Sequence, residues 1–141
     1  MDDRHALERF VAAQAPVIDA VLVELAAGAK RSHWMWFVFP QLAGLGRSAT
    51  ARIYGIASRD EALAYWRHPV LGPRLAQCSN LLLPHAARGA SRVLGPVDAI
   101  KLRSCLTLFE QVAPDEPVFG ELLDAFYAGE RDAATLMLLD A

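Results

Sequence analysis

The side chains best suited to ligand binding are concentrated in one segment of the sequence, between Lys30 and Ser48. Cationic and hydrogen-bonding groups stand at both edges of this segment, and large aromatic rings fill its centre. Guanidinium and ammonium groups bind phosphates and carboxylates, and an aromatic face can stack on a flat ligand such as a nucleobase. We therefore select as a candidate binding site Lys30, Ser32, His33, Trp34, Trp36, Gln41, Gly44, Gly46, Arg47 and Ser48, together with Lys101.

Four large aromatic side chains lie within six residues of this segment, and they include two of the three tryptophans of the chain. They are Trp34, Trp36, Phe37 and Phe39. One interpretation is a buried central helix or strand that is aromatic on every side because it is covered on every side. The other is that one tryptophan lines a pocket and presents its ring to a ligand. The sequence leaves both interpretations open.

Polar residues stand directly beside these rings, Lys30, Ser32 and His33 before them and Gln41 after them. A lone histidine is more often a structural residue than a catalyst, and no acidic residue is near His33 in the sequence. In a functional role, the imidazole of His33 could take part in proton transfer or donate to a phosphate. We include it as a binding residue and assign it no catalytic step.

The glycine-rich turn from Gly44 to Ala49 matches the G-x-G-x-x-A form of the dinucleotide-binding fingerprint. That fingerprint works at a strand-to-helix turn of a parallel sheet, and this sequence has at most one candidate strand. A more general prediction remains. Glycines let backbone amides turn toward an anion, Ser48 begins a short helix, and Arg47 adds a guanidinium group. The turn is therefore either an anion site or a plain loop that leads into a helix.

Other chemistries find little support in the sequence. The four histidines show neither HxxxH nor HExxH spacing, and no cysteine lies near them, so we predict no metal site. Cys78 and Cys105 are expected to be reduced thiols in the core. No serine or cysteine has a base that the sequence places beside it, so the catalytic residues, and whether the protein is an enzyme, stay unknown. No cofactor is predicted.

The remaining sequence predicts the helices that must position this segment. Apolar residues recur at the helical period, as in the stripe that ends at Gly28, and Ser58 with Glu61 forms a capping box. The alternation that strands need is absent. We expect one all-α domain over residues 1–141, with six to eight helices, at about residues 7–14, 16–27, 49–54, 62–67, 72–83, 97–112, 117–127 and 133–139.

Charge is unevenly distributed along the chain, although the net charge is only −2. Residues 25–97 hold nine bases and two acids, whereas both ends of the chain are acidic. Either the basic middle pairs with the acidic ends inside the fold, or it forms an electropositive face for phosphate, nucleotide or nucleic acid. The small net charge argues against an extended nucleic-acid interface.

The sequence also suggests where the protein is found. No run approaches 18 apolar residues, so no membrane span is expected. Acidic residues scattered through positions 1–25 do not fit a signal peptide. We therefore expect a cytoplasmic protein.

Several phrases of the sequence resemble an uncharacterised bacterial family, the domain of unknown function numbered eighteen-ten. These phrases are KRSHWMWFVFPQ (30–41), GLGRS (44–48), HPVLGPRL (68–75), KLRS (101–104), TLF (107–109), GERD (129–132) and TL (135–136). The resemblance covers nearly the whole chain and implies a multihelical fold. Some members carry a calpastatin-like label, after a disordered protease inhibitor, whereas this chain has the composition of a globule.

Two functions fit these features. The first is a domain that binds a phosphate-bearing or nucleotide-like ligand in a cleft around residues 30–48, with Lys101 beside it. The second is a protein-protein interaction module that docks on an acidic partner through an exposed aromatic and basic patch. The two differ in whether the indoles of Trp34 and Trp36 face a concave pocket or a flat surface.

Overall fold

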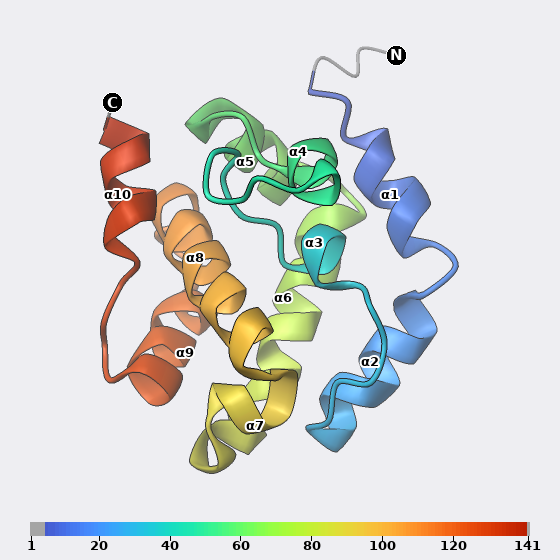
Figure 1. Ribbon diagram of the computed structural model, residues 1–141, viewed down its shortest axis with the longest axis vertical. Coiled ribbons are helices and arrows are strands. Elements are labelled where there is room, and N and C mark those ends of the chain that lie inside the picture. The colour runs from blue at the N-terminus through green and yellow to red at the C-terminus, as the bar shows by residue number, and fades with distance from the viewer. Residues whose placement is uncertain (1–4, 141) are drawn as a thin grey trace.

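The chain is built from helices packed around two long ones, α6 and α8 (Figure 1). The computed structural model describes residues 5–140. In chain order the helices are α1 (Glu8–Gln14), α2 (Ile18–Ala27), α3 (Met35–Val38), α4 (Ala49–Tyr54), α5 (Arg59–Arg67), α6 (Leu71–Leu82), the 3-10 helix η1 (Leu83–Arg88), α7 (Ala90–Leu94), α8 (Pro96–Val112), α9 (Pro117–Tyr127) and α10 (Ala133–Asp140).

The all-α prediction is confirmed, but the expected number of six to eight holds only for the longer helices. Residues 5–140 contain ten α-helices, of which seven have seven residues or more. The other three, α3, α4 and α7, have four to six residues, which is too short for a hydrophobic repeat to develop. In these same residues, extended backbone pairs only at an isolated bridge between Leu42 and Ile56.

The helix ends follow the capping residues in the sequence. The hydroxyl of Ser48 accepts from the backbone N–H of Ala51 at the start of α4, and that of Ser58 accepts from Glu61 at the start of α5. Gly28 ends α2 with φ of +68°, the left-handed conformation that favours glycine. One expected end differs, because the chain continues beyond α6 as the 3-10 helix η1 instead of stopping at the proline of position 84.

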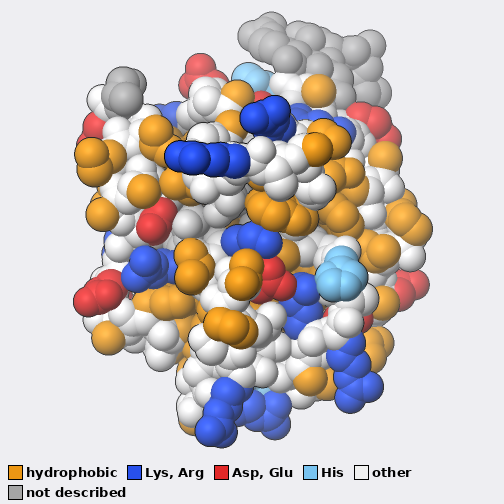
Figure 2. Space-filling model, viewed as in Figure 1, with side chains coloured by type: hydrophobic (Ala, Val, Ile, Leu, Met, Phe, Trp, Pro, Cys, Tyr) orange, Lys and Arg blue, Asp and Glu red, His pale blue; other side chains and the backbone are white. Residues whose placement is uncertain are grey.

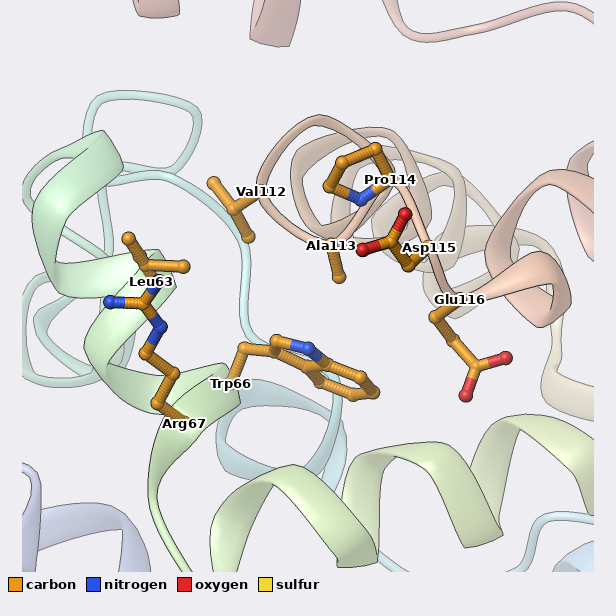
Figure 3. Close-up of a pocket in the computed structure, with 8 residues that line it drawn as sticks. All are labelled: Leu63, Trp66, Arg67, Val112, Ala113, Pro114, Asp115 and Glu116. Atoms are coloured by element: carbon orange, nitrogen blue, oxygen red, sulfur yellow. The ribbon is translucent and has the colours of Figure 1, made fainter.

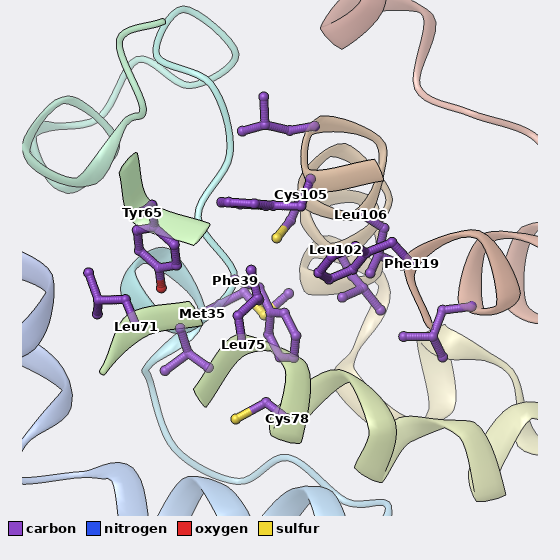
Figure 4. Packing of buried hydrophobic residues seen from close by; sticks show 14 of the residues in the cluster. Met35, Phe39, Tyr65, Leu71, Leu75, Cys78, Leu102, Cys105, Leu106 and Phe119 are labelled. Atoms are coloured by element: carbon purple, nitrogen blue, oxygen red, sulfur yellow. The ribbon is translucent and has the colours of Figure 1, made fainter. Parts of the chain in front are cut away.

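The core lies where α3, α5, α6, α8 and α9 meet (Figure 4). Their largest fully buried side chains are apolar or aromatic, and α8 alone buries nine residues. Both cysteines lie in this cluster as free thiols, as the sequence predicts. On its outer side α8 is covered by α10, where Asp132 accepts from Ser104 and from the backbone N–H of Thr135.

A buried polar contact holds α1 against the rest of the fold. Gln14 is 1% exposed, and its amide N–H₂ donates to the hydroxyl of Tyr65, 3.0 Å away, and to the backbone carbonyl of Phe37, 2.7 Å away. Arg74 donates to the amide oxygen of Gln14. Buried polar groups must find such partners, and these bonds join α1 to α3, α5 and α6.

Membrane spans need about 20 apolar residues in one helix. The longest helix, α8, has 17 residues. Within residues 5–140 no single helix is long and apolar enough to cross a membrane; only α1 and α2 taken together pass that test, and they are bent by 68°.

The segment from Lys30 to Ser48 crosses the face of the molecule that Figure 1 presents. It starts beside α7, where the backbone N–H of Lys30 donates to the carbonyl of Val93. It then passes through α3, which packs on α1 and α4, and reaches the bridge between Leu42 and Ile56. The segment is thus anchored at its beginning, middle and end.

Candidate functional site

A small hollow opens between the start of this segment and the first turns of α8. Its volume is about 80 Å³, and it is lined by Lys30, His33, Trp34, Met35, Trp36, Asp98 and Lys101. Basic, acidic and histidine side chains gather on this face of the molecule around apolar ones (Figure 2). Five of the eleven predicted binding residues therefore line one hollow, including Lys101, which is 71 positions from Lys30.

Two lysines share one carboxylate in this hollow. The ammonium of Lys30 lies 2.9 Å from one oxygen of Asp98, and that of Lys101 lies 3.3 Å from the other. All three side chains are largely withdrawn from solvent, with exposed fractions of 8% for Lys30, 17% for Lys101 and 18% for Asp98. One carboxylate cannot neutralise two ammonium groups, so the hollow keeps an excess positive charge.

Trp36 joins the hollow to the glycine-rich turn. The ammonium of Lys101 lies 3.7 Å from the centre of its ring, a cation–π contact, and the side chain is half-buried. On the other side, a Cβ atom on Gly46 would lie 3.6 Å from Cζ3 of Trp36 and 2.7 Å from Cβ of Ala51. Glycine at position 46 is thus required by the close approach of α4, and it places the turn against the indole.

Trp34 is a structural residue of the segment, in contrast to Trp36. It is only 1% exposed, its indole N–H donates to Glu24 over 3.0 Å, and its ring packs on Phe39. Lys30 lies 5.0 Å above its ring. Both rings adjoin the hollow, but Trp34 is almost fully buried in the core, whereas Trp36 is half-buried and has surface that a ligand could reach.

Glu24, in the last turn of α2, organises the loop before the hollow, although nothing in the sequence marks it as a site residue. Its carboxylate accepts from the backbone N–H groups of Arg31 and Ser32, from the Ser32 hydroxyl and from the indole of Trp34. Burial by itself raises the pKa of Glu24, but these hydrogen bonds outweigh it and lower that pKa to about 2. The Ser32 hydroxyl is therefore bound to Glu24, and Ser32 is not one of the residues that line the hollow.

The glycine-rich turn is more exposed than the hollow. Gly44 has φ of +95°, and Arg47 and Ser48 are exposed. The Ser48 hydroxyl caps α4, and α4 has only six residues. Gln41 is half-buried and holds the turn through its backbone carbonyl, which accepts from Ile56. In the part of the chain that the structure describes, Arg47 forms no ion pair.

The basic middle of the chain is mostly not neutralised by the acidic ends. Among its nine bases, Lys30 alone forms an ion pair with another residue in the range 5–140. Arg74 and Arg88 donate instead to neutral amide or carbonyl groups. Pairing between the basic middle and the acidic ends of the chain therefore occurs between Lys30 and Asp98, but it is not general among the described residues. No group of three or more metal-ligating side chains occurs in the described part of the chain.

Comparison with known proteins now decides the family. A model of the family described as "Protein of unknown function (DUF1810)" matches residues 4–139. The chain belongs to this family. Among solved structures, the chain is similar to the conserved hypothetical protein Rv1873 from Mycobacterium tuberculosis, with 48% sequence identity, a TM-score of 0.96 and 99% of each chain covered. No curated protein matches it.

The DUF1810 membership confirms the resemblance seen in the phrases from KRSHWMWFVFPQ onward. The likeness to Rv1873 over the whole chain supports the helical arrangement described above. Neither relative carries an activity in its description, so the function must be argued from the site.

Proposed function

We propose that the protein binds a small phosphate-bearing ligand in the hollow between α3 and α8. The observation that supports this most directly is the sharing of Asp98 by Lys30 and Lys101. An ammonium group that is withdrawn from water and only half compensated gains from an added anion. A phosphate supplies oxygen acceptors and up to two negative charges at neutral pH, which matches this excess.

His33 completes the polar lining on the exposed side of the hollow. Its side chain is exposed and lines the hollow from the loop before α3, whereas Asp98 and Lys101 line it from α8. In either protonation state a ring nitrogen can donate to a phosphate oxygen. The proposal gives His33 a binding role and no catalytic step.

The size of the hollow limits what it encloses. Ligand pockets that surround a whole drug-sized molecule have volumes of roughly 300–1,000 Å³. At about 80 Å³, this hollow takes a single anionic group. The rest of a nucleotide-like ligand would lie outside it, along Trp36 and the Gly44–Ser48 turn, where the guanidinium of Arg47 has no ion-pair partner among residues 5–140. We propose that such a ligand comes from the cytoplasm.

An interaction module remains the second candidate, and one observation favours it. Val97 and Ile100 are 63% and 64% exposed on the first turns of α8, next to Asp98 and Lys101. Exposed apolar residues beside charges occur at protein interfaces. The burial of Trp34, however, removes one of the two indoles from such a patch, which favours the ligand-binding proposal.

The test is isothermal titration of the protein with inorganic phosphate and with ADP, on the wild type and on Lys101→Met. Methionine keeps a long side chain over Trp36 and removes the charge. Because a hydrogen bond to a charged group contributes about 1.5–3 kcal/mol, we expect Lys101→Met to weaken binding roughly tenfold or more. Arg47→Ala should weaken the binding of ADP more than that of phosphate, and His33→Ala should weaken the binding of both.

Arg92→Ala is the matched control, because Arg92 is an exposed base on α7 that does not line the hollow. It should bind both probes like the wild type. Equal affinity of the wild type and Lys101→Met for both probes would reject the proposal, as would a wild type that binds neither probe at millimolar concentration.

A further inference from the structure

A larger cavity lies at the opposite end of α8. Its volume is about 530 Å³, and Leu63, Trp66 and Arg67 of α5 line one side of it (Figure 3). The other side is formed by the junction of α8 and α9, from Val112 to Glu116. At 1.5 Å per residue, Lys101 and Val112 are roughly 16 Å apart along the helix axis, so this cavity is separate from the hollow.

The charge of this cavity is opposite to that of the hollow. Two carboxylates, of Asp115 and Glu116, and one guanidinium, of Arg67, line it. Asp115 and Arg67 are exposed, and neither forms an ion pair with another residue in the described range. The cavity adjoins both the carboxyl end of α8 and the amino end of α9, so the helix dipoles there oppose one another and its charge comes from the side chains.

Trp66 supplies an aromatic surface inside the cavity. Its indole lies across the space, with Leu63 and Arg67 on one side and the two carboxylates on the other (Figure 3). The ring is held by Phe119 of the core, with ring centres 5.4 Å apart and planes at 73°. The side chain is half-buried, and Val112 and Pro114 extend the apolar wall beside it.

An indole face next to unpaired carboxylates is an arrangement that binds organic cations. The ring attracts the cation through its π-electrons, and the carboxylate pairs with it directly. The apolar wall accommodates an alkyl stem, because lysine-like and arginine-like chains cover apolar surface while their charged ends reach a polar group. The volume is within the range of roughly 300–1,000 Å³ that is typical of small-molecule sites.

We infer that this cavity is a second binding site, which takes an alkylammonium or alkylguanidinium group with its stem on Trp66 and its charge at Asp115. The group belongs either to a free small-molecule cation or to a basic side chain of a peptide, since the chemistry at the cavity is the same. Glu116 has a structural role as well, because its carboxylate accepts from the backbone N–H of Val118 at the start of α9. Asp115 does not cap α9, so a substitution at Asp115 tests the charge without disturbing the start of that helix.

The experiment follows the indole N–H resonances of ¹⁵N-labelled protein during titration. The chain has three tryptophans, and Trp66→Phe identifies the resonance of Trp66. The probes are n-butylguanidinium, its neutral isostere n-butylurea, and the blocked tripeptide acetyl-Gly-Arg-Gly-amide. We expect both guanidinium probes to shift the Trp66 resonance saturably. A larger effect of the tripeptide would identify a peptide as the source, and a larger effect of n-butylguanidinium a free small-molecule cation.

Asp115→Asn is the decisive variant, because it removes the charge at constant shape. It should lower the affinity for n-butylguanidinium at least about fivefold, which corresponds to about 1 kcal/mol of binding free energy. Lys101→Met should bind it like the wild type, so failure at this cavity is distinguishable from failure at the hollow. The inference is overturned if n-butylurea shifts the resonance as strongly as n-butylguanidinium, if Asp115→Asn binds with unchanged affinity, or if neither guanidinium probe shifts the Trp66 resonance.

Discussion

Glu24 shows how one side chain shapes the candidate site without lining it. Its carboxylate receives hydrogen bonds from two backbone amides, one hydroxyl and one indole, all from residues 31–34. These bonds fix the path of the chain between α2 and α3, and so they set the positions of Lys30 and His33 at the hollow. The same bonds favour the ionised form of the carboxyl group.

Glu24→Gln should therefore destabilise the protein in a pH-dependent way. The pKa of Glu24 falls from 4.5 to about 2 on folding, so its contribution to the free energy of unfolding is present above pH 4.5 and is lost as pH falls toward 2. The loss at neutral pH should be roughly 1 kcal/mol, because solvent screens a carboxylate near the surface. Urea unfolding of both proteins at pH 7 and at pH 3 measures it.

Glu121→Gln is the control, since Glu121 is exposed on α9. It should leave the difference from the wild type near zero at both pH values. A Glu24→Gln deficit that is as large at pH 3 as at pH 7 would contradict the assigned pKa.

Residue types predict part of the candidate site and miss the part that depends on packing. The sequence points to Lys30, His33 and Trp36 of the hollow, because charged and aromatic groups stand close together there, whereas Lys101 reaches the same hollow only through folding. It does not distinguish Trp34 from Trp36, since only the folded chain shows which indole reaches Glu24. Glu24 lies within a helical stretch of the sequence, and nothing in that stretch predicts its hydrogen bond with Trp34, ten residues further on.

At the scale of elements, helix caps explain why the boundaries could be predicted so closely. The expected helix over residues 117–127 and the cap at Asp132 are both found, as is the short helix begun by Ser48. At Ser58 the expected capping box is only half formed. Its hydroxyl accepts from Glu61, but the carboxylate of Glu61 pairs with Arg9 over 2.8 Å instead of returning to the helix start.

Ser58→Ala should lower the free energy of unfolding by about 1 kcal/mol, because alanine leaves a backbone N–H at the start of α5 without its acceptor. Urea unfolding should show a lower midpoint with an unchanged slope. Ser91→Ala is the comparison, since Ser91 is an exposed serine inside α7 and not a cap. The capping role is disproved if both variants unfold at the same urea concentration.

Short elements mark where sequence patterns stop being informative. The helix α3 has four residues and α7 has five, so neither completes the two turns over which an apolar stripe can be recognised. Their positions come from tertiary contacts, such as the bond from the backbone of Lys30 to Val93 of α7. This bond also sets the start of the segment that carries the hollow.

At the scale of the whole molecule, α8 connects two cavities of opposite charge. Its first turns provide Asp98 and Lys101 to the hollow, and its last turn adjoins Asp115 and Glu116. The asymmetry of charge along the sequence hints at a basic face, but it does not show the acidic cavity, because Trp66 and Asp115 are 49 positions apart. Only the packing of α5 against α8 brings them together.

The core around α6 and α8 should behave as one unit, and its two thiols can report on it. Cys78 and Cys105 have no exposed surface. Burial raises the pKa of the Cys78 thiol to about 12 and holds that of Cys105 well above its usual value, so neither forms a thiolate in the folded protein at pH 8. Labelling by a thiol reagent should therefore require unfolding of the core.

We expect single-cysteine variants, Cys105→Ser and Cys78→Ser, to label slowly and with the same dependence on urea, because each thiol becomes accessible only when α6 and α8 separate. Ser91→Cys, added to each variant, provides an exposed thiol that should react at once. The labelling rate of the buried thiol divided by that of the exposed thiol gives the equilibrium constant of opening, and the free energy of opening calculated from it should equal the free energy of global unfolding. If Cys78 instead labels much faster than Cys105, α6 opens separately, and the two cavities on α8 belong to a part of the fold that is more stable than the rest.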